Sequence, residues 1–352
     1  MSNTRVYVGM SGGVDSSLTA ALLVEQGYDV TGVYMKNWTQ DLPGVKCPWV
    51  DDLADAKRVA VKLGIDFKVF DFENEYKHKV VDYMIDEYKA GHTPNPDIMC
   101  NQEVKFKLFL DAALEDGADM IATGHYAKVN HQSNEIGYLM QAVDKNKDQT
   151  YFLYRITGKA LGKTLFPIGD FDKPTVRKMA AERGLSTATK KDSQGICFVG
   201  QIGIRDFLGI YVDQKPGEII DKNSGKVLGR HEGAIFYTLG QRHGLDVGGG
   251  LPYYVVGKNM DKNEVYVTTD LNDDTLWKKI IKLSDIHWIN QAPNNGTYQI
   301  RVRHRAQLVN AKLSLGDDTI SLNLESPERA IAPGQSVVIY DGDICLGGGI
   351  II

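Results

Sequence analysis

The sequence predicts an α/β protein: an N-terminal parallel sheet with helices on both faces, followed by two small β-rich domains. Strand-like and helix-like segments alternate over the first half of the chain. Beyond Phe207, short β-rich runs separated by Gly, Asn, Asp and Lys turns replace that pattern. The length of 352 residues suits two or three domains, and 43% hydrophobic residues suffice for their cores.

The N-terminal region opens with a β-α-β pattern. An apolar run at 6–10 precedes a helix-like segment at 16–26, which Gly27 closes, and a second apolar run at 30–35. The alternation continues with helix-like segments at 51–63, 76–88, 104–115 and 174–184 and strand-like segments at 67–70 and 120–123. Such alternation is typical of a parallel sheet covered on both faces. We expect this domain to span residues 1–205.

The remaining chain reads as two β-rich units. Hairpin strands are expected at 217–221, 223–229 and 255–257, which predicts a central domain over 206–280. Later strands are expected at 298–305, 311–315, 319–324 and 336–341. Their spacing suits a small barrel or sandwich, and we expect a β-barrel over residues 281–352.

Composition narrows the class of protein. The net charge of -5 and the pI near 5.9 argue against non-specific coating of nucleic acid, which is driven by phosphate neutralisation. No signal-like or membrane-spanning segment is apparent, so we expect a cytoplasmic protein with no membrane partner. The four cysteines are scattered without a C-x-x-C pair, which indicates neither a disulfide framework nor a zinc ribbon.

The strongest motif is the heptapeptide from Ser11 to Ser17, SGGVDSS, between the first strand and the first helix. Gly12 and Gly13 allow a tight turn, and the serines and free helix amides offer donors to phosphate. The Walker and G-x-G-x-x-G patterns are absent. The heptapeptide resembles the SGGxDS loop of ATP pyrophosphatases, in which Asp15 would help hold Mg²⁺. A plain Gly-Ser turn with an aspartate helix cap is the alternative.

Two further segments carry cysteines in polar surroundings. Cys100 is expected at the start of a helix near Asn101, where the helix dipole favours a thiolate, and Asp97 lies three residues before it. Cys197 follows a loop in which Lys190 and Lys191 would favour an anionic sulfur. A buried, inert role is the alternative for either cysteine. Cys47 and Cys345 are expected to be structural.

Taken together, the motifs resemble one family, the bacterial tRNA-specific 2-thiouridylases of the PP-loop, adenine nucleotide alpha hydrolase-like group. The resemblance covers nearly the whole chain. It rests on residues 9–17, 35–38, 47–49, 51–56, 95–101, 123–126, 147–152, 192–198 and 237–242.

The resemblance implies an ATP- and magnesium-dependent sulfurtransferase. It would adenylate the 2-carbonyl oxygen of the wobble uridine of tRNA, and sulfur would then displace AMP. Cys197 would carry sulfur as a persulfide received from a relay carrier or a cysteine desulfurase, Cys100 would release it by disulfide formation, and Asp97 would move a proton. A uracil carbonyl is a poor electrophile and a persulfide a good nucleophile, so this order of steps is chemically reasonable.

The resemblance also assigns binding residues. Those for ATP are Gly9, Met10, Ser11, Gly12, Gly13, Val14, Asp15, Ser16, Met35 and Gly124. Those for tRNA are Asn95, Pro96, Asp97, Lys147, Asp148, Gln149, Arg303 and His304.

The sequence leaves several alternatives open. Arg301, Arg303 and Arg305 would form one basic strand face that tracks phosphates, or a merely solvated face. Asp97, Cys100 and Cys197 could instead ligate an iron cluster. The rival functions are a PP-loop ligase for a small molecule, with incidental cysteines, and a nucleotide-gated RNA-binding protein without chemistry.

Overall fold

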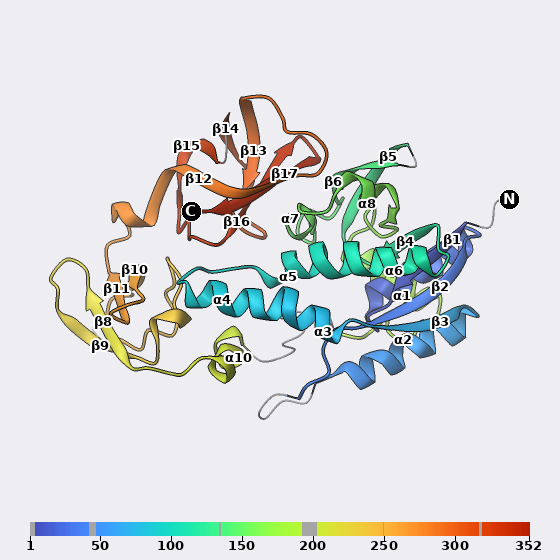
Figure 1. Ribbon diagram of the computed structural model, residues 1–352, viewed down its shortest axis with the longest axis horizontal. Helices are drawn as coiled ribbons and strands as arrows, with labels where there is room; N and C mark the ends of the chain where they lie inside the picture. The colour runs from blue at the N-terminus through green and yellow to red at the C-terminus, as the bar shows by residue number, and fades with distance from the viewer. Residues whose placement is uncertain (1–3, 42–46, 134, 192–202, 249, 317–318) are drawn as a thin grey trace.

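The computed structural model describes residues 4–41, 47–133, 135–191, 203–248, 250–316 and 319–352. Its N-terminal part contains a five-stranded sheet in the order β3-β2-β1-β4-β7, in which every pairing is parallel (Figure 1). The strands are β1 (Arg5–Gly9), β2 (Asp29–Lys36), β3 (Asp66–Asp71), β4 (Met120–Thr123) and β7 (Thr164–Leu165). The expected parallel sheet is confirmed.

Helices cover both faces of this sheet. Neighbouring side chains on a strand point to opposite faces, so Val6 and Val8 of β1 enter one core and Tyr7 enters the other. The first core is closed by α1 (Val14–Glu25), α2 (Trp49–Leu63) and α9 (Lys173–Glu182). The second is closed by α3 (Glu73–Tyr76), η1 (Lys77–Asp82), α4 (Tyr83–Lys89), α5 (Pro96–Met99), η2 (Cys100–Leu108) and α6 (Phe109–Glu115). The segments η1 and η2 are π-helical.

The C-terminal strands form the expected small barrel. Pairing between β12 and β17 closes the sheet, whose order is β12-β15-β14-β13-β16-β17-β6-β5. The barrel strands are β12 (Trp277–Trp288), β13 (Gly296–Arg301), β14 (Val309–Leu315), β15 (Ile320–Arg329), β16 (Ser336–Asp341) and β17 (Ile344–Ile351). The last two members of the sheet, β5 (Ala127–Ser133) and β6 (Ile136–Gln141), come from the N-terminal region.

The hairpin β5–β6 was not expected from the sequence. It follows β4 directly, yet β6 pairs with β17 through Met140 and Ile344. The hairpin therefore ties the barrel to the parallel-sheet domain, and Figure 1 shows it beside the barrel. Short helices α7 (Thr150–Leu153) and α8 (Gly158–Gly162) follow the hairpin.

The central unit is a four-stranded sheet in the order β10-β11-β8-β9. Its strands are β8 (Gly217–Asp221), β9 (Val227–His231), β10 (Tyr254–Asn259) and β11 (Glu264–Thr268). Before it, α10 (Ile204–Tyr211) packs Phe207 against Trp38 of the N-terminal region, with ring centroids 6.2 Å apart. The expected boundaries after residues 205 and 280 thus fall inside α10 and β12.

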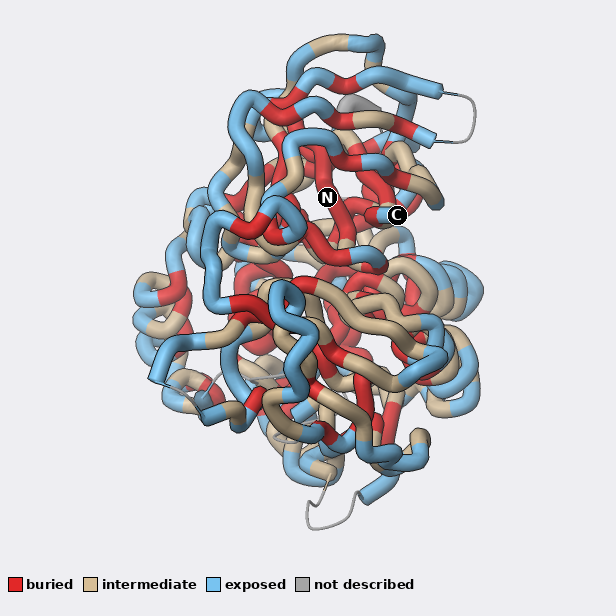
Figure 2. The backbone as a smooth tube through the Cα atoms, turned by 90° about the vertical axis from the view of Figure 1, so that its left-hand side faces the viewer, coloured by how far each residue is buried: buried red, intermediate tan, exposed pale blue. Residues whose placement is uncertain are grey.

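Buried segments, red in Figure 2, run through the whole molecule, and one core joins Tyr154 of the N-terminal region with Ile235 of the central unit and Tyr340 of the barrel. The barrel core gathers apolar side chains such as Leu283, Leu313 and Leu322, and the central unit has its own small core around Ile219 and Val265. Among the described residues, no helix combines the length and the apolar character needed to cross a membrane.

Candidate active site

The phosphate loop lies where the strand order of the parallel sheet reverses. Its residues connect β1 to α1, and β1 is flanked by β2 on one side and β4 on the other. Crevices at such reversals, outside the carboxyl ends of the strands, are the usual ligand sites of parallel α/β sheets. The first helix also points its free amide groups into this crevice, which favours an anion.

Glycine is required at two positions around the loop. Gly12 has a φ of +74°, and a Cβ atom there would lie 2.3 Å from the backbone oxygen of Asp52. A Cβ on Gly124, at the end of β4, would lie 2.7 Å from the amide nitrogen of Ser16. The loop is therefore packed backbone against backbone, which fixes its shape.

Serine hydroxyls hold the loop internally. Ser16 Oγ accepts a hydrogen bond from the amide of Ser11 (3.2 Å) and donates to the carbonyl of Gly13 (3.2 Å). Ser17 Oγ also donates to the Gly13 carbonyl, at 2.8 Å. These bonds leave the amides at the start of α1 pointing outward, toward a ligand.

A cavity of about 810 Å³ opens above the loop and collects most of the sequence-predicted site residues. Its walls come from the carboxyl ends of β1, β2 and β4, the start of α5, the loop before α7 and the loop after β13. The predicted residues that line it are Gly9, Met10, Ser11, Gly13, Val14, Asp15, Ser16, Met35, Asp97, Gly124, Lys147, Gln149 and His304. Segments almost 300 residues apart in sequence thus share one cavity.

Asp15 is held by two partners. Both of its carboxylate oxygens lie 2.8 Å from Lys173 Nζ, and Tyr126 donates its hydroxyl to Asp15 Oδ1 at 2.9 Å. The Lys173 ammonium also lies over the ring of Tyr126, 5.6 Å from its centroid. Lys173 and Tyr126 both line the cavity, so the carboxylate is oriented at its edge.

The donor set of this cavity fits an adenine nucleotide with Mg²⁺. The outward amides of α1 suit phosphate oxygens, and Met35 offers an apolar surface. Mg²⁺ bound to nucleotide phosphates needs only one or two carboxylates, which Asp15 can supply. No group of three or more His, Cys, Asp or Glu that could hold a metal by themselves exists among the described residues.

The segment at 95–101 differs from expectation. The helix begins at Pro96, not near Asn101: Asn95 Oδ1 caps it by accepting from the amide of Asp97 at 3.1 Å, and α5 runs on into η2. Cys100 therefore lies within the helix, 1% exposed in the second core, and outside the cavity lining. The expected helix-terminal position of its thiol was wrong, because Pro96 and Asn95 start the helix one turn earlier.

The cysteines have different surroundings. Cys197 lies outside the described residues. Cys47, expected to be structural, is half-buried and lines the cavity, with Sγ 3.6 Å from the carbonyl of Trp38. Burial raises the pKa of the Cys47 thiol, and it does the same for Cys345, which is buried in β17 as expected.

One of the two lysines before Cys197 is paired with carboxylates of α2. Lys190 Nζ lies 2.7 Å from Asp52 and 2.6 Å from Asp55. Burial opposes its charge, but the hydrogen bonds to the two carboxylates raise the pKa of Lys190. The two carboxylates of α2 thus compensate the charge of Lys190, and its expected influence on the sulfur of Cys197 lies outside the described residues.

The expected basic strand is wrong. β13 ends at Arg301, and a turn follows in which Arg305 has a φ of +61°. Arg301 is buried and pairs with Asp148 at 2.8 Å, while Arg303 is exposed. The arginines therefore do not share one strand face. The strand ends at Arg301, and the side chain of Arg301 turns inward to the buried carboxylate of Asp148.

Asp148 is also not a surface residue. It is 1% exposed and accepts hydrogen bonds from the amide of Ala142 (3.0 Å), from Thr150 Oγ1 (2.7 Å) and from Arg301. Its neighbours Lys147 and Gln149 do face the cavity. The structure thus gives Asp148 a structural role, in place of the expected contact with tRNA.

His304 and Phe152 form an aromatic pair at the cavity wall. Their ring centroids lie 4.4 Å apart, and His304 Nδ1 is buried with no hydrogen-bond partner among the residues described. Burial, then the charges of Arg305 and Arg301, lower the pKa of His304 to about 4, so the ring is neutral at pH 7. A flat neutral ring with an unused polar atom suits contact with a nucleobase.

Sequence reasoning missed several residues of the cavity. His125 receives a contact from Lys105 Nζ at 3.5 Å and one from Thr123 Oγ1 at 2.8 Å, and burial lowers its pKa well below the ordinary value. The motif at 123–126 contained His125 and Tyr126 but gave them no role. Nothing in the local sequence singled out Lys105 or Lys173.

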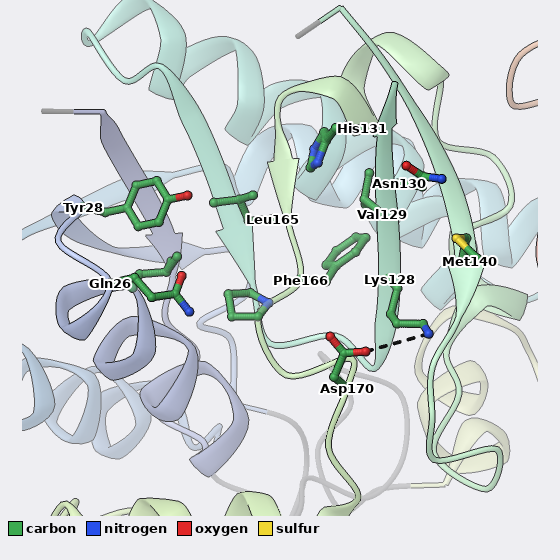
Figure 3. Close-up of a pocket in the computed structure, with 12 residues that line it drawn as sticks. Gln26, Tyr28, Lys128, Val129, Asn130, His131, Met140, Leu165, Phe166 and Asp170 are labelled. Atoms are coloured by element: carbon green, nitrogen blue, oxygen red, sulfur yellow. Dashed lines mark ion pairs between the residues drawn. The ribbon is translucent and has the colours of Figure 1, made fainter. Parts of the chain in front are cut away.

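A second cavity, of about 370 Å³, lies between α1 and the hairpin β5–β6 (Figure 3). Lys128 and Asp170 form an ion pair across it at 3.8 Å, and His131 Nε2 lies 3.1 Å from the carbonyl of Thr164. None of the sequence-predicted site residues lines it. The larger cavity is therefore the candidate active site.

A loop with this sequence, set at the strand-order reversal of a parallel sheet, defines the PP-loop class of nucleotide-binding proteins. Comparison with family models agrees: residues 4–201 match the tRNA methyl transferase HUP domain, 205–269 the tRNA methyl transferase PRC-barrel domain, and 278–351 the aminomethyltransferase beta-barrel domain.

Curated relatives identify the family. A tRNA-specific 2-thiouridylase MnmA of Pediococcus pentosaceus is 46% identical, covering 99% of this chain and 95% of the relative. The protein of the same name from Listeria monocytogenes is 48% identical, with the same two coverages. The chain belongs to the tRNA-specific 2-thiouridylase family and is a sulfurtransferase. The solved complex of a 4-thiouridine synthetase with RNA and ATP is more distant, at 18% identity and a TM-score of 0.37 over 53% of this chain and 43% of that one.

Proposed function

We propose that this chain replaces the 2-carbonyl oxygen of the wobble uridine in tRNA with sulfur, with ATP as the activating co-substrate. The coarser function, tRNA thiolation, is that of its family. The observation that supports the finer proposal is the shared cavity: the phosphate loop, Asp97 and the polar loops at 147–149 and 304 face the same space. Nucleotide and target base would therefore meet within it.

In this proposal the phosphate loop, residues 9–16, binds the triphosphate of ATP, and Met35 and Gly124 contact its adenosine part. Mg²⁺, held by Asp15, would screen the charge of the phosphates and help pyrophosphate to leave. The amides at the start of α1 hold the anion without a lysine in the loop.

The tRNA would approach from the side of the barrel. Asn95, Pro96 and Asp97 would contact the target base, with Lys147, Gln149, Arg303 and His304 around it. Anticodon loops present unpaired bases, so the uracil can leave its stack at modest cost. We propose units of residues 1–205 for catalysis, 206–280 as a connecting β domain and 281–352 as a tRNA-contacting barrel.

Activation precedes sulfur transfer. The 2-carbonyl oxygen attacks the α-phosphorus, which releases pyrophosphate and converts the oxygen into part of an AMP leaving group. Asp97 lines the cavity and accepts or returns the uracil proton as the base changes tautomer. Without adenylation, the carbonyl carbon would be too weak an electrophile.

The sulfur step uses two thiols. The terminal sulfur of a persulfide on Cys197 bonds to the activated carbon, and AMP departs with the former carbonyl oxygen. Cys100 then attacks the inner sulfur of Cys197, the S–S bond to the base breaks, and the base keeps a thiocarbonyl. The product disulfide between the two cysteines needs two electrons from a cellular thiol reductant. Cys100, the first residue of η2, is 1% exposed, so this step requires the segments that bury it to admit the second sulfur.

The test is a thiolation assay with purified protein, ATP, Mg²⁺, a persulfide donor and unmodified tRNA, in which 2-thiouridine is measured by mass spectrometry of nucleosides. We expect Cys100→Ser and Cys197→Ser each to abolish the product while leaving ATP binding intact. Cys47→Ser, in the same cavity but outside the proposed chemistry, is the matched control and should stay active. Full activity of either of the first two variants would refute the two-cysteine mechanism.

A further inference from the structure

The phosphate loop lacks a lysine, so any cationic side chain that adds to the helix amides and Mg²⁺ in binding a triphosphate comes from another part of the chain. The described cavity wall carries several of them. They are Lys105, Lys147, Lys173, Lys190, Lys191 and Arg305. The question is which of these the fold directs to the phosphates.

Lys173 stands out by its position against the loop itself. Its ammonium contacts both oxygens of Asp15 at 2.8 Å, and Asp15 lies on the first turn of α1, directly after the glycines. Lys190, by contrast, is held by Asp52 and Asp55 of α2. Of Lys173 and Lys190, it is therefore Lys173 that is bound to the phosphate loop.

The backbone of Lys173 is fixed while its ammonium faces the cavity. The residue opens α9 after the cap Asp172, and its amide donates to Asp144 Oδ2 at 3.2 Å. The residue is 9% exposed, and it lines the cavity. A lysine tethered in this way can turn its ammonium by rotation of the side chain alone, without moving the helix.

We propose that Lys173 binds the terminal phosphates of ATP and serves as the cation that the loop does not carry. Asp15 keeps the ammonium at the loop before the nucleotide arrives. When Mg²⁺ and ATP enter, Asp15 turns to the metal, and Lys173, which has three donors, keeps one contact with Asp15 and gives the others to phosphate oxygens. This inference rests on the proposed ATP-dependent function and adds a phosphate-binding residue to it.

A purely structural role makes a different prediction. If Lys173 only pinned α9 to α1, its loss would weaken the binding of all nucleotides equally by loosening the loop. If it binds terminal phosphates, its loss should weaken ATP and pyrophosphate binding and spare AMP, which lacks those phosphates.

The experiment is calorimetric titration of the full chain with ATP, pyrophosphate and AMP, each with Mg²⁺. For Lys173→Met we expect affinity for ATP and pyrophosphate to fall roughly tenfold to a hundredfold, as for a lost charge-assisted contact, with AMP changing less than about threefold. Lys178→Met, on the exposed side of the same helix, is the control and should bind all three ligands like wild type. Lys173→Gln keeps a hydrogen bond to Asp15 without the charge and should repeat the pattern if the Met variant does not fold.

The outcomes separate the two proposals. A wild-type chain that binds none of the ligands overturns the ATP-dependent function, and this inference with it. Wild-type binding combined with an equal loss for ATP and AMP in the variants, or with no loss for ATP, overturns only the role of Lys173.

Discussion

Two acid–base pairs with the same contact distance have opposite surroundings. Lys173 and Asp15 meet at 2.8 Å on the cavity wall, with side chains 11% and 30% exposed. Arg301 and Asp148 also meet at 2.8 Å, but their side chains are 7% and 0% exposed, between the barrel and the loop before α7. The first pair is open to a ligand, and the second is sealed.

The difference shows that contact distance alone does not define a site. Asp148 has its oxygens occupied by Ala142, Thr150 and Arg301, and Arg301 also stacks over Tyr340 at 5.4 Å. Such a pair fixes one arrangement of the barrel on the N-terminal region. The open pair can exchange one partner for another, since water and ligands reach it.

Removing the cation from each pair should give the largest contrast. Arg301→Met leaves the Asp148 carboxylate buried without its cation, and we expect a loss of about 3–5 kcal/mol in unfolding free energy. Lys173→Met leaves Asp15 partly solvated and should cost much less. Urea and thermal unfolding without ligand measure both. Equal losses of unfolding free energy in the two variants would show that solvent exposure does not change what each ion pair contributes to stability.

Crowding the open site should affect ligand binding more than folding. In Gly124→Ala the new methyl group would lie 2.7 Å from the backbone of Asp15 and Ser16, so the loop must shift. If the steric cost of about 1–3 kcal/mol is borne by the loop in its ATP-binding shape, ATP should bind roughly five- to hundredfold more weakly in titration. Gly229→Ala, where nothing lies within 4 Å of the added atom, is the control. Unchanged ATP affinity in Gly124→Ala would place the nucleotide elsewhere.

Removing the hydroxyl of Tyr126 should have a smaller effect on ATP binding. Tyr126→Phe removes the hydroxyl that donates to Asp15 Oδ1 at 2.9 Å but keeps the ring beneath Lys173. We expect about 1 kcal/mol, or roughly a fivefold weaker binding of ATP with Mg²⁺. Tyr298→Phe, whose hydroxyl contacts the Asn294 carbonyl on the barrel, should bind ATP like wild type. An identical loss in both variants would argue against a specific role for the Asp15 contact.

The last prediction concerns the pH dependence of stability. Burial and the nearby arginines lower the pKa of His304 to about 4 from an ordinary value of 6.5, so the unfolded chain takes up a proton before the folded chain does. Burying the neutral His304 ring therefore costs no protonation free energy above pH 6.5. As the pH falls from 6.5 toward 4, the unfolded chain is protonated first and the free energy of unfolding decreases. The melting temperature of wild type should fall more over this range than that of His304→Gln. Parallel curves for the two proteins would contradict the shifted pKa.

Local sequence patterns gave much of the N-terminal fold. The expected strand at 6–10 corresponds to β1, that at 30–35 to β2 and that at 120–123 to β4, while the helix expected from Pro174 is α9. The glycines after β1 also predicted the position of the phosphate loop between β1 and α1, because a tight turn before a helix needs them. These features depend on neighbours within a few residues.

Other features were not predicted, although one of them had a local signal. The helix that holds Cys100 begins at Pro96 because an asparagine cap and a proline outweighed the later polar residues. The basic run at 301–305 looked like one strand face, yet Arg301 turns inward to a carboxylate far away in sequence. The hairpin β5–β6 was overlooked although its two strands pair locally, and only its attachment to β17 depends on the other end of the chain.

The sequence by itself determined the parallel sheet, the phosphate loop and the family. Only the tertiary structure decided that Asp15 meets Lys173, 158 residues away, in an open cavity, and that Asp148 meets Arg301, 153 residues away, in a sealed one. Periodicity and glycine conformations are set by neighbouring residues and can be read along the chain. The partner of a charged side chain, and whether water reaches the pair, depend on how separate cores pack together.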